Sequence, residues 1–274
     1  MPESDLTRIG SYRVITAPVM GQVKGLVHGF GTRKQAGTKS RSVANFAAPF
    51  TASGAFDTKS AVADLGKELG FAAKNILFPK QVHGNRVLVF DSAPPDPEEV
   101  RQTEADAIIT NVPGLLIGVM TADCLPILIH DPNRKVVAAI HAGWRGTLNQ
   151  VARRTLEILV KDFRCEPGDL AVALGPSISG QSFEVDESLL NQFRQTFEYW
   201  SRYARPQRQA KWLIDFRMIN AHMLALMGLE ERNFWISTHC TYLEKDLFHS
   251  YRRDGEQAGR MFNFIGLKAQ KGRS

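Results

Sequence analysis

The sequence has few cysteines and no long apolar run. Its three cysteines, Cys124, Cys165 and Cys240, lie far apart and leave at least one thiol unpaired, which excludes a disulfide-stabilised scaffold. The longest uncharged run, residues 107–122, is 16 residues long and contains a proline and a glycine, so it is too short to span a membrane. Residues 1–14 lack the apolar core of a signal peptide. We therefore expect a cytoplasmic protein with no membrane partner.

The composition is that of a globular protein. Of the 274 residues, 43% are hydrophobic and 23% are charged, values that exclude collagen-like and fully disordered chains. The net charge of +6 favours anionic partners but does not require nucleic acid. Because no linker or internal repeat is visible, we expect a single domain over residues 1–274, with residues 268–274 as a frayed basic tail.

Short apolar runs bounded by turn residues dominate the middle of the chain. The predicted strands there are residues 76–78, 86–90, 107–110, 115–122, 126–130 and 135–141. The connections are too short for a crossover helix between each pair, so we expect an α/β protein with antiparallel or mixed sheets. The last four of these runs are the predicted core.

Apolar residues at helical spacing predict four helices. The first is capped by Asp57 or Thr58, contains Ala61, Val62, Leu65 and Leu69, and ends at Gly70. The others cover residues 147–163, 187–199 and 215–227, the last lying between an Asp215 cap and Gly228. Further strands are predicted at residues 12–17, 23–30, 170–174, 234–237 and 261–267.

Three side chains suited to metal binding lie beside predicted strand ends. They are His83 in KQVHG, Cys124 in TADC and His141 in HAGWRG, separated by 41 and 17 residues. Two imidazoles and a thiolate suit zinc or copper, and three protein ligands leave a fourth position for water or substrate, as in catalytic zinc sites. The alternative is that Cys124 is a small buried apolar residue and both histidines are hydrogen-bonded core residues. Spacing alone favours this second interpretation.

The alternation of side chains along a strand indicates whether Asp123 could be a further metal ligand. If the strand continues through Cys124, Asp123 points to the opposite face and is not a ligand. It could orient a ligand or pair with an arginine, or its carboxylate could simply accept nearby backbone N–H groups.

Two arginines lie in glycine-rich segments that could receive an anion. Arg145 enters a predicted helix in GWRGT, and Arg33 follows GFGT. A different basic segment could bind nucleic acid through phosphate contacts and stacking, although an exposed face with inward-pointing aromatics is the commoner explanation. Its cations are Arg194, Arg202, Arg205, Arg208 and Lys211, and its aromatic residues are Phe197, Tyr199, Trp200 and Tyr203.

Several separated blocks resemble one known family. KQVHG, TADCLP, HAGWRGT and SYRRDG, the last at residues 250–255, are similar to the signature blocks of the bacterial laccase-domain family. This family was formerly called multicopper polyphenol oxidase and is now regarded as purine nucleoside phosphorylase with adenosine deaminase activity. The resemblance runs from about His28 to Leu267, in the family's order. One departure is AGTK at residues 36–39, where the family usually has GGVS.

The resemblance implies a fold, a metal site and substrates. The family fold is a four-layer α/β/β/α sandwich with mixed sheets. By motif, His83, Cys124 and His141 would hold a catalytic Zn²⁺, with Cu²⁺ possible, and Asn45 and Arg33 match pocket residues of the family. Arg33 and Arg145 are our phosphate-binding candidates. The implied substrates are adenosine, inosine, guanosine and methylthioadenosine, with phosphate as cosubstrate and no nucleic acid.

Two other functions stay open from the residues. Cys124 could be the nucleophile and His141 the base of a metal-free cysteine hydrolase acting on amide bonds of cell-wall precursors. The basic aromatic segment could instead make the chain a nucleic-acid-binding protein. A laccase with four coppers is excluded, because seven histidines with no His-x-His pair are too few to ligate both a blue-copper site and a trinuclear cluster.

Overall fold

The computed structural model describes residues 6–21, 23–35, 58–92 and 95–269. Two six-stranded sheets form its centre. The first has the order β1 (Leu6–Ile9), β2 (Tyr12–Ile15), β3 (Leu26–Gln35), β15 (Met261–Leu267), β7 (Leu116–Thr121) and β4 (Ile76–Leu77). The second has the order β14 (Phe234–Ile236), β10 (Ala171–Leu174), β8 (Leu125–Asp131), β9 (Val136–Ala142), β6 (Ala107–Thr110) and β5 (Val87–Phe90). Both sheets are mixed, because β4, β5 and β14 pair in parallel and the remaining pairs are antiparallel.

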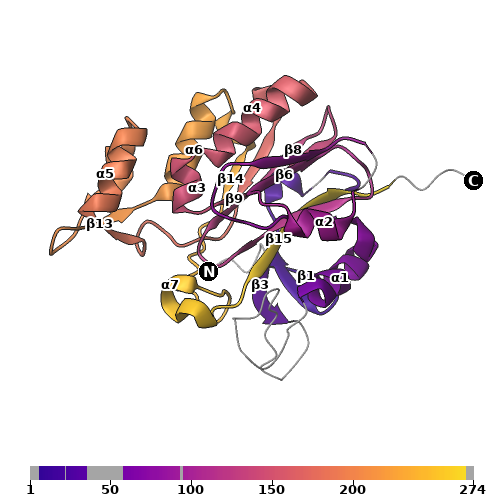
Figure 1. The fold of residues 1–274 in the computed structure, drawn as a ribbon, viewed down its shortest axis with the longest axis horizontal. Helices are drawn as coiled ribbons and strands as arrows, with labels where there is room; N and C mark the ends of the chain where they lie inside the picture. Colours follow the sequence, from indigo (N-terminus) through magenta and orange to yellow (C-terminus); the bar gives the residue numbers. More distant parts are fainter. Residues whose placement is uncertain (1–5, 22, 36–57, 93–94, 270–274) are drawn as a thin grey trace, which may run out of the picture.

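Helices cover the outer faces of both sheets. The helices are α1 (Thr58–Leu69), α2 (Pro97–Gln102), α3 (Trp144–Leu148), α4 (Val151–Phe163), α5 (Glu187–Thr196), α6 (Phe216–Leu226) and α7 (Tyr251–Asp254). In Figure 1, α4 and α6 lie at the top, α1 lies at the bottom right, and β6, β8 and β15 lie between them. This confirms the predicted four-layer α/β/β/α sandwich.

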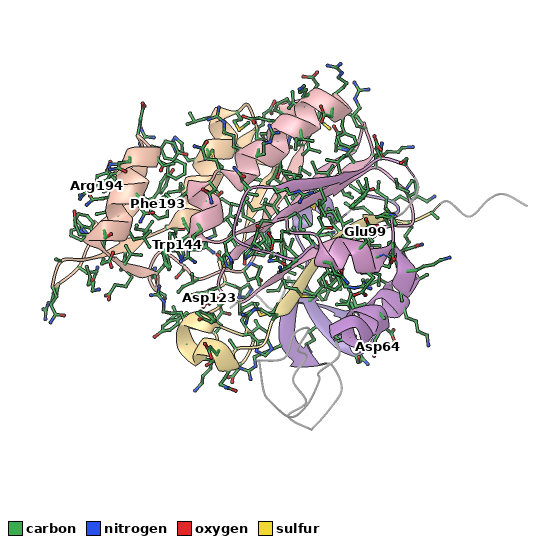
Figure 2. The ribbon with its side chains drawn as sticks, in the orientation of Figure 1. Asp64, Glu99, Asp123, Trp144, Phe193 and Arg194 are labelled. Carbon is green, nitrogen blue, oxygen red and sulfur yellow. The ribbon has the colours of Figure 1, made fainter. Side chains whose placement is uncertain are left out.

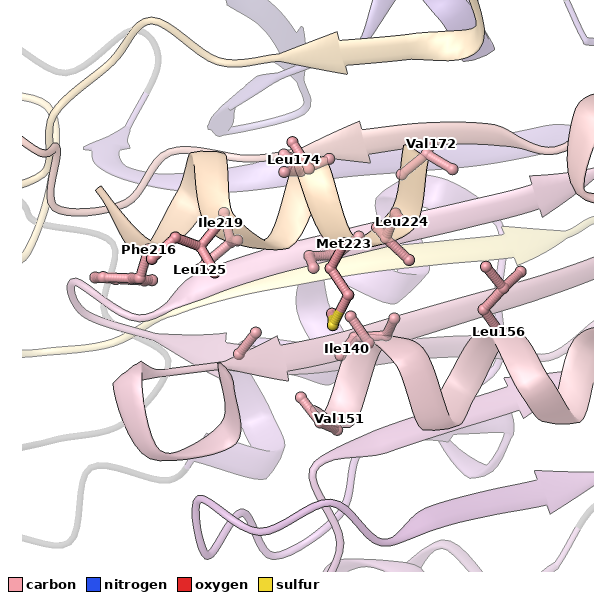
Figure 3. Close-up of a cluster of buried hydrophobic side chains, with 14 of the residues drawn as sticks. Leu125, Ile140, Val151, Leu156, Val172, Leu174, Phe216, Ile219, Met223 and Leu224 are labelled. Carbon is pink, nitrogen blue, oxygen red and sulfur yellow. The ribbon is translucent and has the colours of Figure 1, made fainter. Parts of the chain in front are cut away.

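Three hydrophobic clusters lie between the four layers. Figure 3 shows the first, which contains Leu125 and Ile140 of the second sheet, Leu156 of α4 and Leu224 of α6. The second cluster lies between the sheets, and the third packs α1 against the outer face of the first sheet. A strand buried on both faces reads as a continuous apolar run, which is why the four central runs were recognisable as core.

The predicted helix over residues 147–163 is wrong in one respect. The chain forms two helices there, α3 and α4, separated by Gln150 in the left-handed region at φ 55°. The break lets α3 begin at Trp144, directly after the end of β9, while α4 packs along the second sheet. Leu148 and Val151 fit one continuous helical pattern, so the apolar spacing did not show the break.

A third, small sheet was not predicted. It has the order β11 (Glu184–Asp186), β13 (Lys211–Ile214) and β12 (Ala204–Pro206). In Figure 1, its strand β13 and helix α5 lie at the left of the molecule. Helix α2 was also missed, because its Asp96 cap and Pro97 read as part of a turn.

The ends of the described chain bear on two other predictions. Lys268, at the start of the predicted tail, donates its backbone N–H to Gly25 O at 2.8 Å. Residues 270–274 lie outside the described part, so the frayed tail stays a prediction. No helix within the described ranges is both long and apolar enough to cross a bilayer.

Candidate metal centre

His83 lies in a loop that is fixed to the first sheet by a glutamine. The Gln81 side chain accepts from Met120 N at 2.7 Å and donates to Met120 O at 2.8 Å, as a neighbouring strand would. His83 itself adopts φ 61°, a left-handed conformation uncommon for a residue other than glycine. The loop therefore turns sharply at His83 while it stays attached to β7.

Cys124 lies where the chain crosses from the first sheet to the second. Strand β7 ends before it, and Asp123 turns the chain in the left-handed region at φ 84°. The Asp123 carboxylate accepts hydrogen bonds from Thr241 Oγ1 at 2.6 Å, Ser250 Oγ at 2.9 Å and the Arg252 backbone N–H at 2.6 Å. The assumed strand alternation is thus wrong at this point. The carboxylate is satisfied by hydrogen bonds, as one interpretation of Asp123 expected, but two of the three donors are side-chain hydroxyls and not backbone N–H groups.

His141 is the penultimate residue of β9, and a glycine beyond it leaves room for the other two side chains. A Cβ atom on Gly143 would lie 2.8 Å from Cys124 Sγ and 3.1 Å from His83 Cδ2. Any larger residue at this position would therefore push into the space between the predicted ligands.

The structure brings His83, Cys124 and His141 together. Their donor atoms all lie within 4.8 Å of one another, and His83 Nε2 is 3.8 Å from Cys124 Sγ. The rings of the two histidines meet edge to face, with centroids 4.8 Å apart. Tetrahedral zinc with bonds of about 2.0–2.3 Å needs donors about 3.4–3.6 Å apart, so a small closure of this set would fit such an ion. Among the described residues, this is the one group of three or more potential ligands of this kind.

A buried carboxylate that the sequence motifs did not indicate lies behind the three side chains. Asp106 is 0% exposed and lies directly before β6. It accepts hydrogen bonds from His141 Nδ1 at 2.8 Å, His83 N at 2.9 Å and Gly84 N at 2.7 Å. The sequence indicated Asp106 only weakly, as an acidic residue that directly precedes the apolar run of β6.

Neighbouring groups shift the pKa of Cys124 and the pKa of His141. Burial opposes ionisation of the Cys124 thiol, but the charge of His141 and hydrogen bonds from both histidines outweigh it and lower the pKa of Cys124 to about 6. Burial also disfavours a charged His141 ring, but the charge of Cys124 and the hydrogen bond to Asp106 raise the pKa of His141 to about 9. Cys124 is therefore a thiolate near neutral pH, the form that binds metals and attacks electrophiles.

A pocket of about 760 Å³ opens over these side chains. Figure 2 shows Trp144 beside α3 and Asp123 beside α7, two of the elements that line it. The pocket has an aromatic and a cationic character. Its aromatic lining is Phe78, Trp144, Phe183, Phe216 and Tyr251, and its arginines are Arg101, Arg145, Arg252 and Arg260.

The predicted anion-binding residues have different places. Arg145 lines the pocket, with its guanidinium carbon 4.3 Å from the centroid of the Trp144 ring. Arg33 is not among the described residues that line the pocket, and its Nη1 donates to Lys245 O at 3.0 Å. Asn45 and residues 36–39 lie outside the described residues.

The basic aromatic segment is held together by its own contacts. Arg194 pairs with Glu187 and lies over two rings, 4.7 Å from the Trp200 centroid and 5.3 Å from the Trp212 centroid. Both tryptophans pack against the cluster shown in Figure 3. These contacts agree with the interpretation that the aromatic residues point inward.

The chain is similar to known proteins of one family. The family described as multi-copper polyphenol oxidoreductase laccase matches residues 28–268. A protein named purine nucleoside phosphorylase from Deinococcus radiodurans is 37% identical over 213 residues, which are 77% of this chain and 78% of that protein. A protein named adenosine deaminase RL5, from an unknown prokaryotic organism, is 34% identical over 74% of this chain and 79% of its own length.

A solved structure shares the fold. The crystal structure of YlmD from Geobacillus stearothermophilus superposes with a TM-score of 0.84 at 25% identity, covering 97% of this chain and 99% of that one. On the match over residues 28–268 and these relatives, the chain belongs to the multi-copper polyphenol oxidoreductase laccase family.

Proposed function

We propose that this protein is a zinc-dependent purine nucleoside phosphorylase that also deaminates adenosine. The observation that carries the proposal is the convergence of His83, Cys124 and His141 at a pocket large enough for a nucleoside. Relatives named purine nucleoside phosphorylase and adenosine deaminase support the reaction class. The proposed substrates are adenosine, inosine, guanosine and methylthioadenosine, with phosphate as the second substrate.

The donor set fits a catalytic metal. Two imidazoles and one thiolate suit Zn²⁺, and Cu²⁺ is the alternative ion for the same residues. A bound zinc ion would supply a Lewis acid that lowers the pKa of water to about 7. Three protein ligands would leave such an ion able to bind water or substrate as well.

The chain's own residues account for substrate binding. The flat rings of Trp144, Phe183 and Tyr251 line the pocket and offer surfaces against which a purine can stack. Arg145 lines the same pocket, and its planar guanidinium suits a phosphate. We also propose substrate contacts for Arg33 and Asn45, on their motif positions.

The two reactions use this pocket differently. In phosphorolysis the bond between C1′ and N9 breaks, a phosphate oxygen bonds to C1′, and the base leaves with a proton. In deamination water replaces the amino group at C6 and ammonia leaves. Negative charge develops on the leaving purine in phosphorolysis and on the purine ring in deamination, and the arginines and the ion at the pocket would stabilise it.

The experiment is to incubate the purified protein with adenosine and phosphate. We expect adenine and ribose 1-phosphate from phosphorolysis, and inosine and ammonia from deamination. His141→Ala should abolish all four products, whereas His222→Ala, which removes a histidine bonded to Tyr203 outside the pocket, should not. No product from the wild-type protein would contradict the proposal.

A metal-free cysteine hydrolase acting on amide bonds of cell-wall precursors is a second candidate. One observation favours it: Cys124, His141 and Asp106 are linked in the order nucleophile, base and orienting carboxylate. Removal of metal by a chelator separates the two functions. Hydrolysis that survives chelation and is lost on alkylation of Cys124 would favour the hydrolase.

We further propose that the protein works in the cytoplasm. All three cysteines are free, and a thiolate ligand at the pocket requires that Cys124 stay reduced. Localisation of the tagged full-length chain by cell fractionation tests this.

A further inference from the structure

We infer that Asp106 is a positioning residue that aligns two of the three predicted metal ligands with one carboxylate. The inference rests on the proposed metal site, but it concerns a residue that carries no ligand atom itself. Asp106 lies behind His83 and His141, on the side away from Cys124, and does not line the pocket within the described part of the chain.

Both carboxylate oxygens are engaged. Oδ1 accepts from His83 N at 2.9 Å and from His141 Nδ1 at 2.8 Å. Oδ2 accepts from Gly84 N at 2.7 Å and Val82 N at 3.3 Å. A single side chain thus joins the loop that carries His83 to the strand that carries His141.

The bond to His141 fixes which ring nitrogen is available. Because Nδ1 donates to Asp106, Nε2 is left as the nitrogen that can bind a metal. A carboxylate that receives the second N–H of a ligating histidine also orients the ring and raises its basicity.

The bonds to the loop fix His83. Its left-handed backbone at φ 61° needs surrounding contacts to hold it, and three successive N–H groups, from Val82 to Gly84, converge on Asp106. Without these bonds the loop would remain attached to the first sheet through Gln81, and His83 would keep the 3.4 Å hydrogen bond from Asn149 Nδ2 to its carbonyl oxygen but lose the contacts to its N–H side. Loss of Asp106 should therefore misplace both imidazoles.

The test is the metal dissociation constant of Asp106→Ala, measured with zinc by chelator competition. The matched control is Asp131→Ala. Asp131 is also buried, at 1% exposure, and accepts two backbone N–H groups, from Asn133 at 2.7 Å and Arg134 at 2.8 Å. It ends β8, whereas Asp106 precedes β6 at the opposite end of the same sheet.

We expect Asp106→Ala to bind zinc about 10–100-fold more weakly than the wild type, and Asp131→Ala to bind it within about twofold. Equal affinities in folded Asp106→Ala and Asp131→Ala would overturn the inference. If the wild type binds no zinc, the proposed metal site fails instead. The two failures are therefore distinguishable.

A measurement on the wild-type protein covers the case in which Asp106→Ala does not fold. Nitrogen-15 NMR of the zinc-loaded protein should show the His141 proton on Nδ1, protected from exchange with solvent. A proton on Nε2 of His141, or a freely exchanging one on Nδ1, would overturn the inference in the same way.

Discussion

At the scale of single residues, Gly143 is a position where one added methyl group would act directly on the predicted metal ligands. Its φ of −67° suits any residue, so alanine would not strain the backbone there. The added methyl would instead lie 2.8 Å from Cys124 Sγ. We predict that Gly143→Ala lowers zinc affinity at least about tenfold, because it displaces a ligand atom.

The control for this prediction is Gly21→Ala. Gly21 has φ −70°, and the nearest atom to its added Cβ is 3.4 Å away. Both variants should melt within a few degrees of the wild type. Unchanged zinc affinity in Gly143→Ala would show that the donor atoms are not held as tightly as the structure indicates.

Two buried histidines should make stability depend on pH. Burial lowers the pKa of His28 and of His130 to about 4 each, against an ordinary value of 6.5. Below pH 6.5 the unfolded chain takes up protons at these positions and the folded protein does not. The free energy of unfolding therefore falls as the pH drops from about 6.5 to about 4, by about 1.4 kcal/mol per pH unit for each histidine.

His130→Leu isolates one of these contributions. His130 is 1% exposed, and its Nδ1 has no hydrogen-bond partner among the described residues, so leucine loses no bond of that atom there. Between pH 7 and pH 5 we expect the variant to lose about 2 kcal/mol less of its unfolding free energy than the wild type, measured by urea denaturation. Parallel pH profiles for the two proteins would contradict this.

At the scale of elements, helix α6 depends on the cap that the sequence indicated. Asp215 accepts from Met218 N at 3.1 Å, and Gly228 follows the helix at φ 96°. We predict that Asp215→Ala lowers the free energy of unfolding by about 1 kcal/mol, in a denaturant titration. Asp215→Asn keeps an acceptor oxygen and should lose only a fraction of this; equal losses would mean that the side chain acts otherwise than as a cap.

The elements also show which local patterns can be interpreted without a structure. The predicted strands at 107–110 and 261–267 match β6 and β15 in full, because apolar β-formers end there at polar or turn residues. The small sheet that includes β12 and β13 was missed because it is short and partly exposed, and it lacks a long apolar run.

At the scale of the whole molecule, the order of strands was beyond a local interpretation of the sequence. The C-terminal β15 lies between β3 and β7, so the first sheet is completed only when the end of the chain pairs with segments far earlier in it. Such pairing depends on long-range contacts that no local pattern records. The layer architecture was available only through the resemblance of the motif blocks.

Local motifs were enough to predict part of the candidate site. His83, Cys124 and His141 are residue types with characteristic chemistry beside glycines and strand ends, so the motifs pointed to them. Asp106 has no such context, and its role depends on where the loop around His83 folds in space. Arg33 was selected by its motif alone, and its contact with Lys245 O could not be foreseen from the sequence.

The proposed function depends on a metal ion held by three residues that lie far apart in the sequence. Because three hydrophobic clusters hold the layers together, Cys124→Ala should fold and keep a melting temperature near that of the wild type. It should lose the metal, since only two of the three donors remain.

The most direct test is elemental analysis of the full chain purified without added metal, together with Cys124→Ala prepared in parallel. We predict one zinc ion per wild-type chain and essentially none in the folded variant. Wild-type protein without metal, or a variant with the same metal content as the wild type, would contradict the account.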